Sequence, residues 1–129
     1  GGTPGAGKVL VSDANGLASW SANSHGGASL ISATATMAAT DNYNLIVFSG
    51  STASQTITLP SATDAGAGRE ITIKNIASVS VAVAATAGKL ISDSTTTGAT
   101  GLNIGIEPSN NWIKAISDGT NWIILRALF

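Results

Sequence analysis

Apolar and polar residues alternate along most of this chain with a period of two. In the runs 56–59 (TITL), 70–75 (EITIKN) and 79–84 (VSVAVA), Ile, Val or Leu alternates with Thr, Ser, Lys or Ala. Successive side chains of a β-strand point to opposite faces of a sheet, so this pattern predicts half-buried antiparallel strands. The alanines form no helical stripe, so 33–36 (ATAT) is also a predicted strand, and only 37–41 (MAATD) is expected to form one helical turn.

Two further segments predict β-hairpins. In each, two alternating runs flank a short segment rich in Asp, Asn and Gly: 8–12 and 17–21 around 13–16, and 111–117 and 121–127 around 118–120. Such turns need a positive φ, which Gly tolerates. A two-residue turn at Asp118 and Gly119 would place Ile116 opposite Asn121. The run Ile123-Ile124-Leu125 is apolar on both faces, so it is expected to be covered on both sides, by the fold or by another subunit.

The domain organisation follows from these short strands and their breaks. Strands separated by Gly, Asn and Pro predict an all-β sandwich or barrel-like domain. The Gly-rich segment 24–27 (SHGG) is the best boundary, which gives an N-terminal hairpin unit, 1–27, and a head domain, 28–129. The chain starts with Gly-Gly-Thr-Pro and has no signal-peptide pattern, so it reads as a piece of something longer.

Composition narrows the classes of function. The chain has 129 residues, a net charge of −1, 10% charged residues and no cysteine. It lacks the basic footprint of nucleic-acid binding, and its apolar runs are too short to insert into a membrane as a helix. The lack of cysteine excludes disulfides and thiolate metal sites. So few charges, with strands that are apolar on both faces, predict burial between identical subunits.

No set of residues predicts catalysis, a metal site or a cofactor. His25 is the only histidine, whereas zinc needs three or four converging ligands. The carboxylates are scattered beside residues typical of turns, and no pair is marked as the acid and base of a glycosidase. The glycines from Gly2 to Gly7 precede Lys8 as in a phosphate loop, but Val9 replaces the required hydroxyl and a strand follows instead of a helix. We therefore expect a protein that is not an enzyme.

Two loops carry the candidate ligand-binding residues. Trp112 and Trp122 are expected to pack in the sheet or between subunits, although exposed rings would suit a sugar. Tyr43 has polar neighbours on a predicted turn, and the Ser- and Thr-rich loop 92–101 is the longest irregular stretch. Recognition usually occurs on loops displayed by a rigid scaffold, and the alternative is a solvated loop without a partner. The candidate residues are Tyr43, Asn42, Asn44, Asp93 and Thr96.

Five motifs follow one another in a distinctive order. They are 58–61 (TLPS), 68–75 (GREITIKN), the three alternating valines of 79–83, 88–91 (GKLI) and 117–122 (SDGTNW). In this order they resemble the C-terminal head module of bacteriophage tail-fibre and related virion-fibre proteins. The segment 5–20 is similar to a hairpin found just before such heads, at the end of a fibre shaft. The resemblance implies a homotrimer at the distal end of a fibre, facing a host surface, and carries over no catalytic residues.

The expected protein is therefore a non-enzymatic, trimeric terminal module of a phage fibre. Its fold would be a compact antiparallel β-sandwich, jelly-roll-like, preceded by a short hairpin. It would attach a virion to a bacterial surface receptor, with a glycan favoured, and its other partners would be its own copies and the fibre that precedes Gly1. It would lie outside the cell, on a tail or head fibre. The alternatives are a purely structural trimerisation cap or capsid-surface fibre, a monomeric secreted adhesin or carbohydrate-binding domain, and a depolymerase with a carboxylate-lined groove.

Overall fold

The predicted β class is confirmed. The computed structural model describes residues 3–5, 8–22, 27–92, 98, 100–107 and 110–126. Within these residues the chain consists of strands and a single short helix, α1 (Ala62–Ala65). The strands are β1 (Lys8–Ser12), β2 (Ala18–Ala22), β3 (Gly27–Ile31), β4 (Ala35–Thr36), β5 (Tyr43–Phe48), β6 (Gln55–Leu59), β7 (Glu70–Asn75), β8 (Val81–Ala85), β9 (Leu90–Ile91), β10 (Gly101–Ile104), β11 (Trp112–Ser117) and β12 (Trp122–Leu125).

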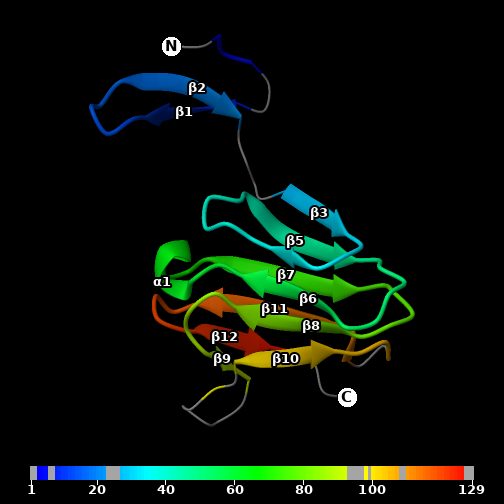
Figure 1. Ribbon diagram of the computed structural model, residues 1–129. Helices are drawn as coiled ribbons and strands as arrows, with labels where there is room; N and C mark the ends of the chain where they lie inside the picture. The colour runs from blue at the N-terminus through cyan, green and yellow to red at the C-terminus, as the bar shows by residue number, and fades with distance from the viewer. Residues whose placement is uncertain are drawn as a thin grey trace.

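These strands form three sheets (Figure 1). Strands β1 and β2 pair with each other as a separate hairpin. A six-stranded sheet has the order β3-β5-β7-β11-β12-β9, and a four-stranded sheet has the order β10-β8-β6-β4. The hairpin therefore shares no strand with the two larger sheets, and β3, which begins at Gly27, already belongs to the six-stranded one.

The two larger sheets are built by a chain that coils. From β3 to β10, consecutive strands alternate between the six-stranded and the four-stranded sheet. After each strand of one sheet, the chain returns through a strand of the opposite sheet to the end from which it started. Successive strands within one sheet therefore run in the same direction. Accordingly, β3, β5 and β7 are parallel, as are β4, β6 and β8. The predicted antiparallel, jelly-roll-like arrangement is wrong for these strands, because alternation records which face is buried and not strand direction.

Antiparallel pairing appears where the coil ends. Strand β11 runs antiparallel to both β7 and β12, and β10 runs antiparallel to β8. The short strand β9 pairs in parallel with the outer side of β12. The hairpin of β11 and β12 therefore lies inside the six-stranded sheet rather than at its edge.

The core lies between the two larger sheets. Each of their long strands places alternate residues inward, as the sequence pattern predicts. The buried apolar residues are Met37, Ile46, Phe48, Ile57, Leu59, Ala62, Ile71, Ile73, Val81, Val83, Leu90, Ile104, Ile113, Ala115, Trp122 and Ile124. Each large side chain among them contributes roughly 1.5–3 kcal/mol by leaving water. The two sheets are therefore held together by one continuous apolar layer.

The closing hairpin forms as predicted, but with a different register. Ser117 pairs with Trp122 and Ile116 with Ile123, so the loop has four residues, 118–121, rather than two. The carboxylate of Asp118 accepts hydrogen bonds from the backbone N–H groups of Thr120 at 2.8 Å and Asn121 at 2.7 Å. The register shifts by two residues, so each side chain keeps the face that the sequence assigned to it.

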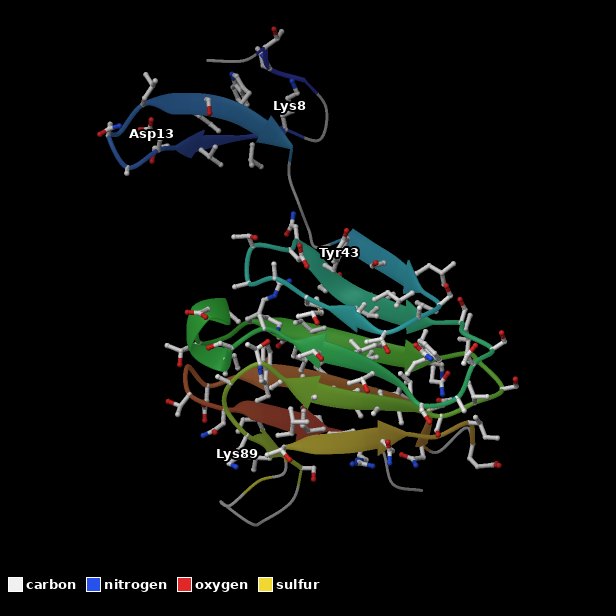
Figure 2. All side chains as sticks on the ribbon, in the orientation of Figure 1. Lys8, Asp13, Tyr43 and Lys89 are labelled. Atoms are coloured by element: carbon white, nitrogen blue, oxygen red, sulfur yellow. The ribbon has the colours of Figure 1, made fainter. Side chains whose placement is uncertain are left out.

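The turn of the first hairpin is also stabilised by an Asp side chain. The carboxylate of Asp13, labelled in Figure 2, accepts hydrogen bonds from the backbone N–H groups of Asn15 and Leu17, both at 2.9 Å. The glycines of the two turns have the predicted positive φ, 78° at Gly16 and 94° at Gly119. Both turns are thus closed by an Asp side chain that replaces missing backbone partners.

The predicted helical turn at 37–41 is wrong. This segment is a turn in which Asp41 and Ala38 bond each other: the Asp41 carboxylate accepts from the Ala38 N–H at 2.8 Å, and the Asp41 N–H donates to the Ala38 carbonyl at 3.1 Å. The helix is instead α1, where the Ser61 side chain caps the first turn by accepting from the Asp64 N–H at 3.3 Å. The sequence analysis did not predict this helix, and the cap pattern of 61–64 (SATD) is the signal that could have found it. The predicted strand at 33–36 is reduced to the two residues of β4.

Candidate interaction surfaces

Three of the sequence motifs meet at one end of the two-sheet body. The indole N–H of Trp122 donates to the carbonyl of Pro60 at 3.0 Å, and both groups are buried. The Ser117 hydroxyl donates to the carbonyl of Ala62 at 2.7 Å and accepts from the Gly119 N–H at 3.1 Å. The motifs TLPS and SDGTNW are therefore joined by buried hydrogen bonds, with α1 beside them (Figure 1).

The motif GKLI belongs to the same end. Gly88 has a φ of 91°, and a Cβ atom there would lie 2.6 Å from the Thr120 carbonyl oxygen, so only glycine fits. The Lys89 N–H donates to the Asn121 side chain at 2.9 Å, and its carbonyl accepts from the Trp122 N–H at 2.8 Å. The loop before β9 thus packs closely against the closing hairpin and is hydrogen-bonded to it.

The last residue of GREITIKN holds the opposite end. Asn75 is 2% exposed, and its side-chain N–H₂ donates to the carbonyls of Val79 at 2.8 Å and Gly105 at 3.0 Å. Its side-chain oxygen accepts from the Ala77 N–H at 2.9 Å. One amide therefore ties the turn after β7 to the end of β10. These motif residues stabilise the fold.

The predicted ligand-binding residues are only partly brought together. Tyr43 begins β5 and is 37% exposed, and Asn42 and Asn44 beside it are also exposed (Figure 2). Asp93 and Thr96 lie outside the described residues. Of the five predicted residues, the three consecutive ones thus form one small surface.

The Tyr43 surface is held from two sides. The Arg69 guanidinium donates to the backbone carbonyls of Asp41, at 2.8 Å, and Tyr43, which fixes the backbone before β5. The ring lies against the start of β3, since a Cβ atom on Gly27 would be 3.4 Å from its Cδ1. A half-exposed aromatic ring beside amide side chains can stack on an apolar sugar face and bond its hydroxyl groups.

The outer face of the six-stranded sheet is largely apolar. Residues that alternate with the core positions of its strands point away from the core. The large apolar ones, called here the outer apolar face, are Leu30, Leu45, Val47, Ile91, Trp112, Ile116, Ile123 and Leu125. Leu30 is 72% and Leu125 is 48% exposed. The sequence pointed to this face only at Ile123–Leu125.

A polar stripe crosses the outer apolar face at its centre. Lys114 and Glu70 form an ion pair at 3.4 Å, and the Lys74 ammonium donates to the Asn111 side chain at 2.6 Å. Such an exposed pair contributes little to stability. The stripe therefore carries charges that already have partners within the chain, between two apolar flanks.

The outer face of the four-stranded sheet has a different character. Its outward positions are small or hydroxylated: Thr36, Thr56, Thr58, Ala82, Ala84 and Asn103. None of these residues is charged, and none is a large hydrophobe. The two outer faces of the body therefore differ sharply, and only one carries a broad apolar surface.

Among the described residues, no pocket is found and no cluster of three metal-ligating side chains occurs. Of the helices in that part of the chain, none is long and apolar enough to cross a membrane. Trp122 is fully buried and Trp112 is half-buried on the outer apolar face, so both pack on the sheet as predicted. Comparison with protein-family models, curated proteins and solved structures finds no match.

Proposed function

We propose that this chain is a non-enzymatic terminal module of a phage fibre, assembled as a homotrimer, that attaches the virion to a bacterial surface. The observation that supports assembly is the outer apolar face. Exposed apolar patches larger than a few hundred Å² normally mark interfaces. Six strands about 4.8 Å apart and roughly 17 Å long present about 400–500 Å² in projection, and the two apolar flanks make up the part of it that lies outside the polar stripe.

The proposed trimer places this face between copies of the chain. Of its three central charges, Lys114 and Glu70 pair with each other, and Lys74 donates to the neutral side chain of Asn111. Burying it would therefore leave no charge of the stripe without a polar contact. The number three comes from the fibre resemblance of the five motifs, since symmetry alone favours pairs.

Light scattering on the purified chain tests the assembly. The expected mass is three times 12.8 kDa. A stable, soluble species with the mass of one chain, 12.8 kDa, would refute the trimer and most of the fibre proposal.

For attachment, we propose the Tyr43 surface as the contact and a cell-surface glycan as the ligand class. Binding of labelled chain to a panel of bacteria is the direct assay. Tyr43→Ala should abolish binding to any strain that the wild type recognises, whereas Thr58→Ala, on the outer face of the four-stranded sheet, should not. Equal binding by both variants would remove Tyr43 from the contact.

The remaining alternatives are separated by the same preparations. A trimer that binds no strain of a broad panel would favour a structural cap or capsid-surface fibre. A monomer that binds glycan would favour a secreted adhesin or carbohydrate-binding domain. Release of reducing sugar from capsule or surface polysaccharide would identify a depolymerase and overturn the non-enzymatic proposal.

A further inference from the structure

The turn between β1 and β2 contains a chemically reactive pair of neighbours, Asn15 and Gly16. No other asparagine of the chain precedes a glycine. Asn15 is exposed, and its side-chain amide has no hydrogen-bond partner among the described residues. Apart from its chain neighbours, a Cβ atom at Gly16 would meet no described heavy atom within 4 Å. The peptide bond between the two residues is therefore open to water and free of steric cover.

We propose that Asn15 deamidates spontaneously in the folded protein, at a rate set by the opening of this turn. The backbone nitrogen of Gly16 attacks the side-chain carbonyl carbon of Asn15. A new C–N bond forms, the attacking nitrogen loses its proton, and the side-chain nitrogen leaves as ammonia. Water then opens the cyclic succinimide at one of its two carbonyls, which gives aspartate or isoaspartate. The only reagent consumed is water, and the proposed attachment function is not required.

Asp13, labelled in Figure 2, restrains the attack while the turn is closed. The Gly16 N–H donates to the Asp13 carbonyl at 3.0 Å. The Asp13 carboxylate also holds the N–H groups of Asn15 and Leu17, both at 2.9 Å and both exposed. The two strands pair only with each other, however, and a lone two-stranded hairpin is marginally stable at best in water. Local opening therefore releases the attacking nitrogen without unfolding of the head.

The similar turn of the closing hairpin is protected. Asp118 precedes Gly119 there, but its carboxylate already accepts two backbone hydrogen bonds within the loop. The Gly119 N–H donates to the hydroxyl of the buried Ser117 at 3.1 Å. Both strands of this hairpin are paired on each side within the six-stranded sheet. An ionised carboxylate is also a poor target for a nitrogen nucleophile, whereas the Asn15 amide is neutral. We therefore expect reaction at the first turn and not at the second.

The products change the turn in two ways. Each carries a new carboxylate close to that of Asp13, so like charges meet where Asp13 binds the N–H of residue 15. Isoaspartate also adds one carbon atom to the backbone path, which displaces the N–H groups that the Asp13 carboxylate holds. Deamidation should therefore loosen the hairpin. The head shares no strand with it, so the Tm of the head should stay the same.

Incubation of the full chain at mildly alkaline pH, with and without guanidinium chloride, tests the inference. The chain in denaturant gives the rate at which Asn15 reacts when no structure restrains it. Digestion with trypsin and mass spectrometry locate each exchange of a side-chain NH₂ for OH, and fragmentation distinguishes isoaspartate from aspartate. In the folded chain we expect reaction at Asn15 first, within a few-fold of the rate in denaturant, and no isoaspartate at Asp118.

Two variants test the geometry of the turn. Gly16→Ala places a Cβ atom beside the attacking nitrogen and should slow the reaction several-fold, both in the folded chain and in denaturant. Asp13→Ala removes the carboxylate that closes the turn, so it should raise the rate in the folded chain to that in denaturant.

Three results would overturn the inference. In the first, Asn15 stays intact in the folded chain while it reacts in denaturant, which would show that the closed turn protects it. In the second, another asparagine of the folded chain reacts before Asn15. In the third, Asp13→Ala leaves the rate in the folded chain unchanged, which would show that opening of the turn does not set the rate.

Discussion

Asn75 is the best position at which to measure how much side-chain hydrogen bonds stabilise one end of the two-sheet body. It makes three short hydrogen bonds, to Val79, Gly105 and Ala77, and it is 2% exposed. Asn75→Ala removes all three and leaves two carbonyls and one N–H group without that partner. At about 1 kcal/mol for each lost bond, and more for a buried group left unsatisfied, the expected loss is about 3 kcal/mol.

This loss is large enough to measure by thermal unfolding. For a domain of this size, 1 kcal/mol lowers Tm by roughly 4–8 °C, so Asn75→Ala should lower Tm by roughly 12–24 °C. Circular dichroism at 218 nm, a wavelength typical of β-strands, follows the transition at about neutral pH. The matched control is Asn103→Ala, which removes an exposed Asn from β10 and should change Tm by only a few degrees.

A second variant identifies which atoms matter. Asn75→Asp keeps the shape but replaces both N–H donors by a carboxylate oxygen that faces the carbonyls of Val79 and Gly105. At neutral pH it should be at least as destabilised as Asn75→Ala, because a buried charge then lacks donors. The reasoning is refuted if Asn75→Ala unfolds within a few degrees of the wild type, or if Asn75→Asp is as stable as the wild type.

Three further predictions concern the opposite end and its loop. Gly88→Ala should lower stability more than Gly66→Ala, because both have positive φ but only the Cβ at Gly88 meets a backbone oxygen, at 2.6 Å; equal urea midpoints would contradict this close approach. Trp122→Phe should cost roughly 1–3 kcal/mol in urea unfolding, because the buried Pro60 carbonyl loses its indole partner; no loss would mean that this bond is dispensable. Backbone hydrogen bonds from Asn121 and Thr120 lower the pKa of Asp118 in the folded protein. The ionised Asp118 therefore stabilises the fold at pH values above the pKa that this carboxyl has in the unfolded chain. This stabilisation is lost as the pH falls through the pKa of Asp118 in the folded protein. Asp118→Asn should therefore flatten the acid side of a Tm-against-pH profile, and an unchanged profile would argue against this role.

The sequence predicts the faces of the strands well, because a period of two directly records burial. Glu70–Asn75 begins and ends where β7 does, and its inward residues Ile71 and Ile73 are fully buried. Strand direction and neighbours leave no such record, so parallel coiling could not be read from the same pattern. The register of the closing hairpin was missed for a local reason, since the Asp118 side chain stabilises a longer loop than Asp-Gly alone suggests.

The candidate surfaces were predictable to different extents. Tyr43 was identified because a single aromatic residue stands among polar residues at a turn, and it is half-exposed there. The outer apolar face was predicted only at Ile123–Leu125, because Leu45 and Val47 have the same residue types as core positions and their outward direction depends on the sheet topology. The hairpin was recognised from its turn, but the exposure of its apolar residues became evident only once its separate sheet was seen.

The alternation of strands between the two larger sheets makes the length of the head adjustable. One strand in each sheet completes a coil, and each coil stacks on the one before it with the same strand directions. The closing hairpin with its Trp122 lock belongs to one side of this stack, and the strand β3 next to the N-terminal hairpin begins the other. A whole coil inserted between β5 and β7 would extend the body by about one strand spacing, roughly 4.8 Å, without altering either terminal element. Variation in the reach of such a module can thus arise by duplication of a single unit.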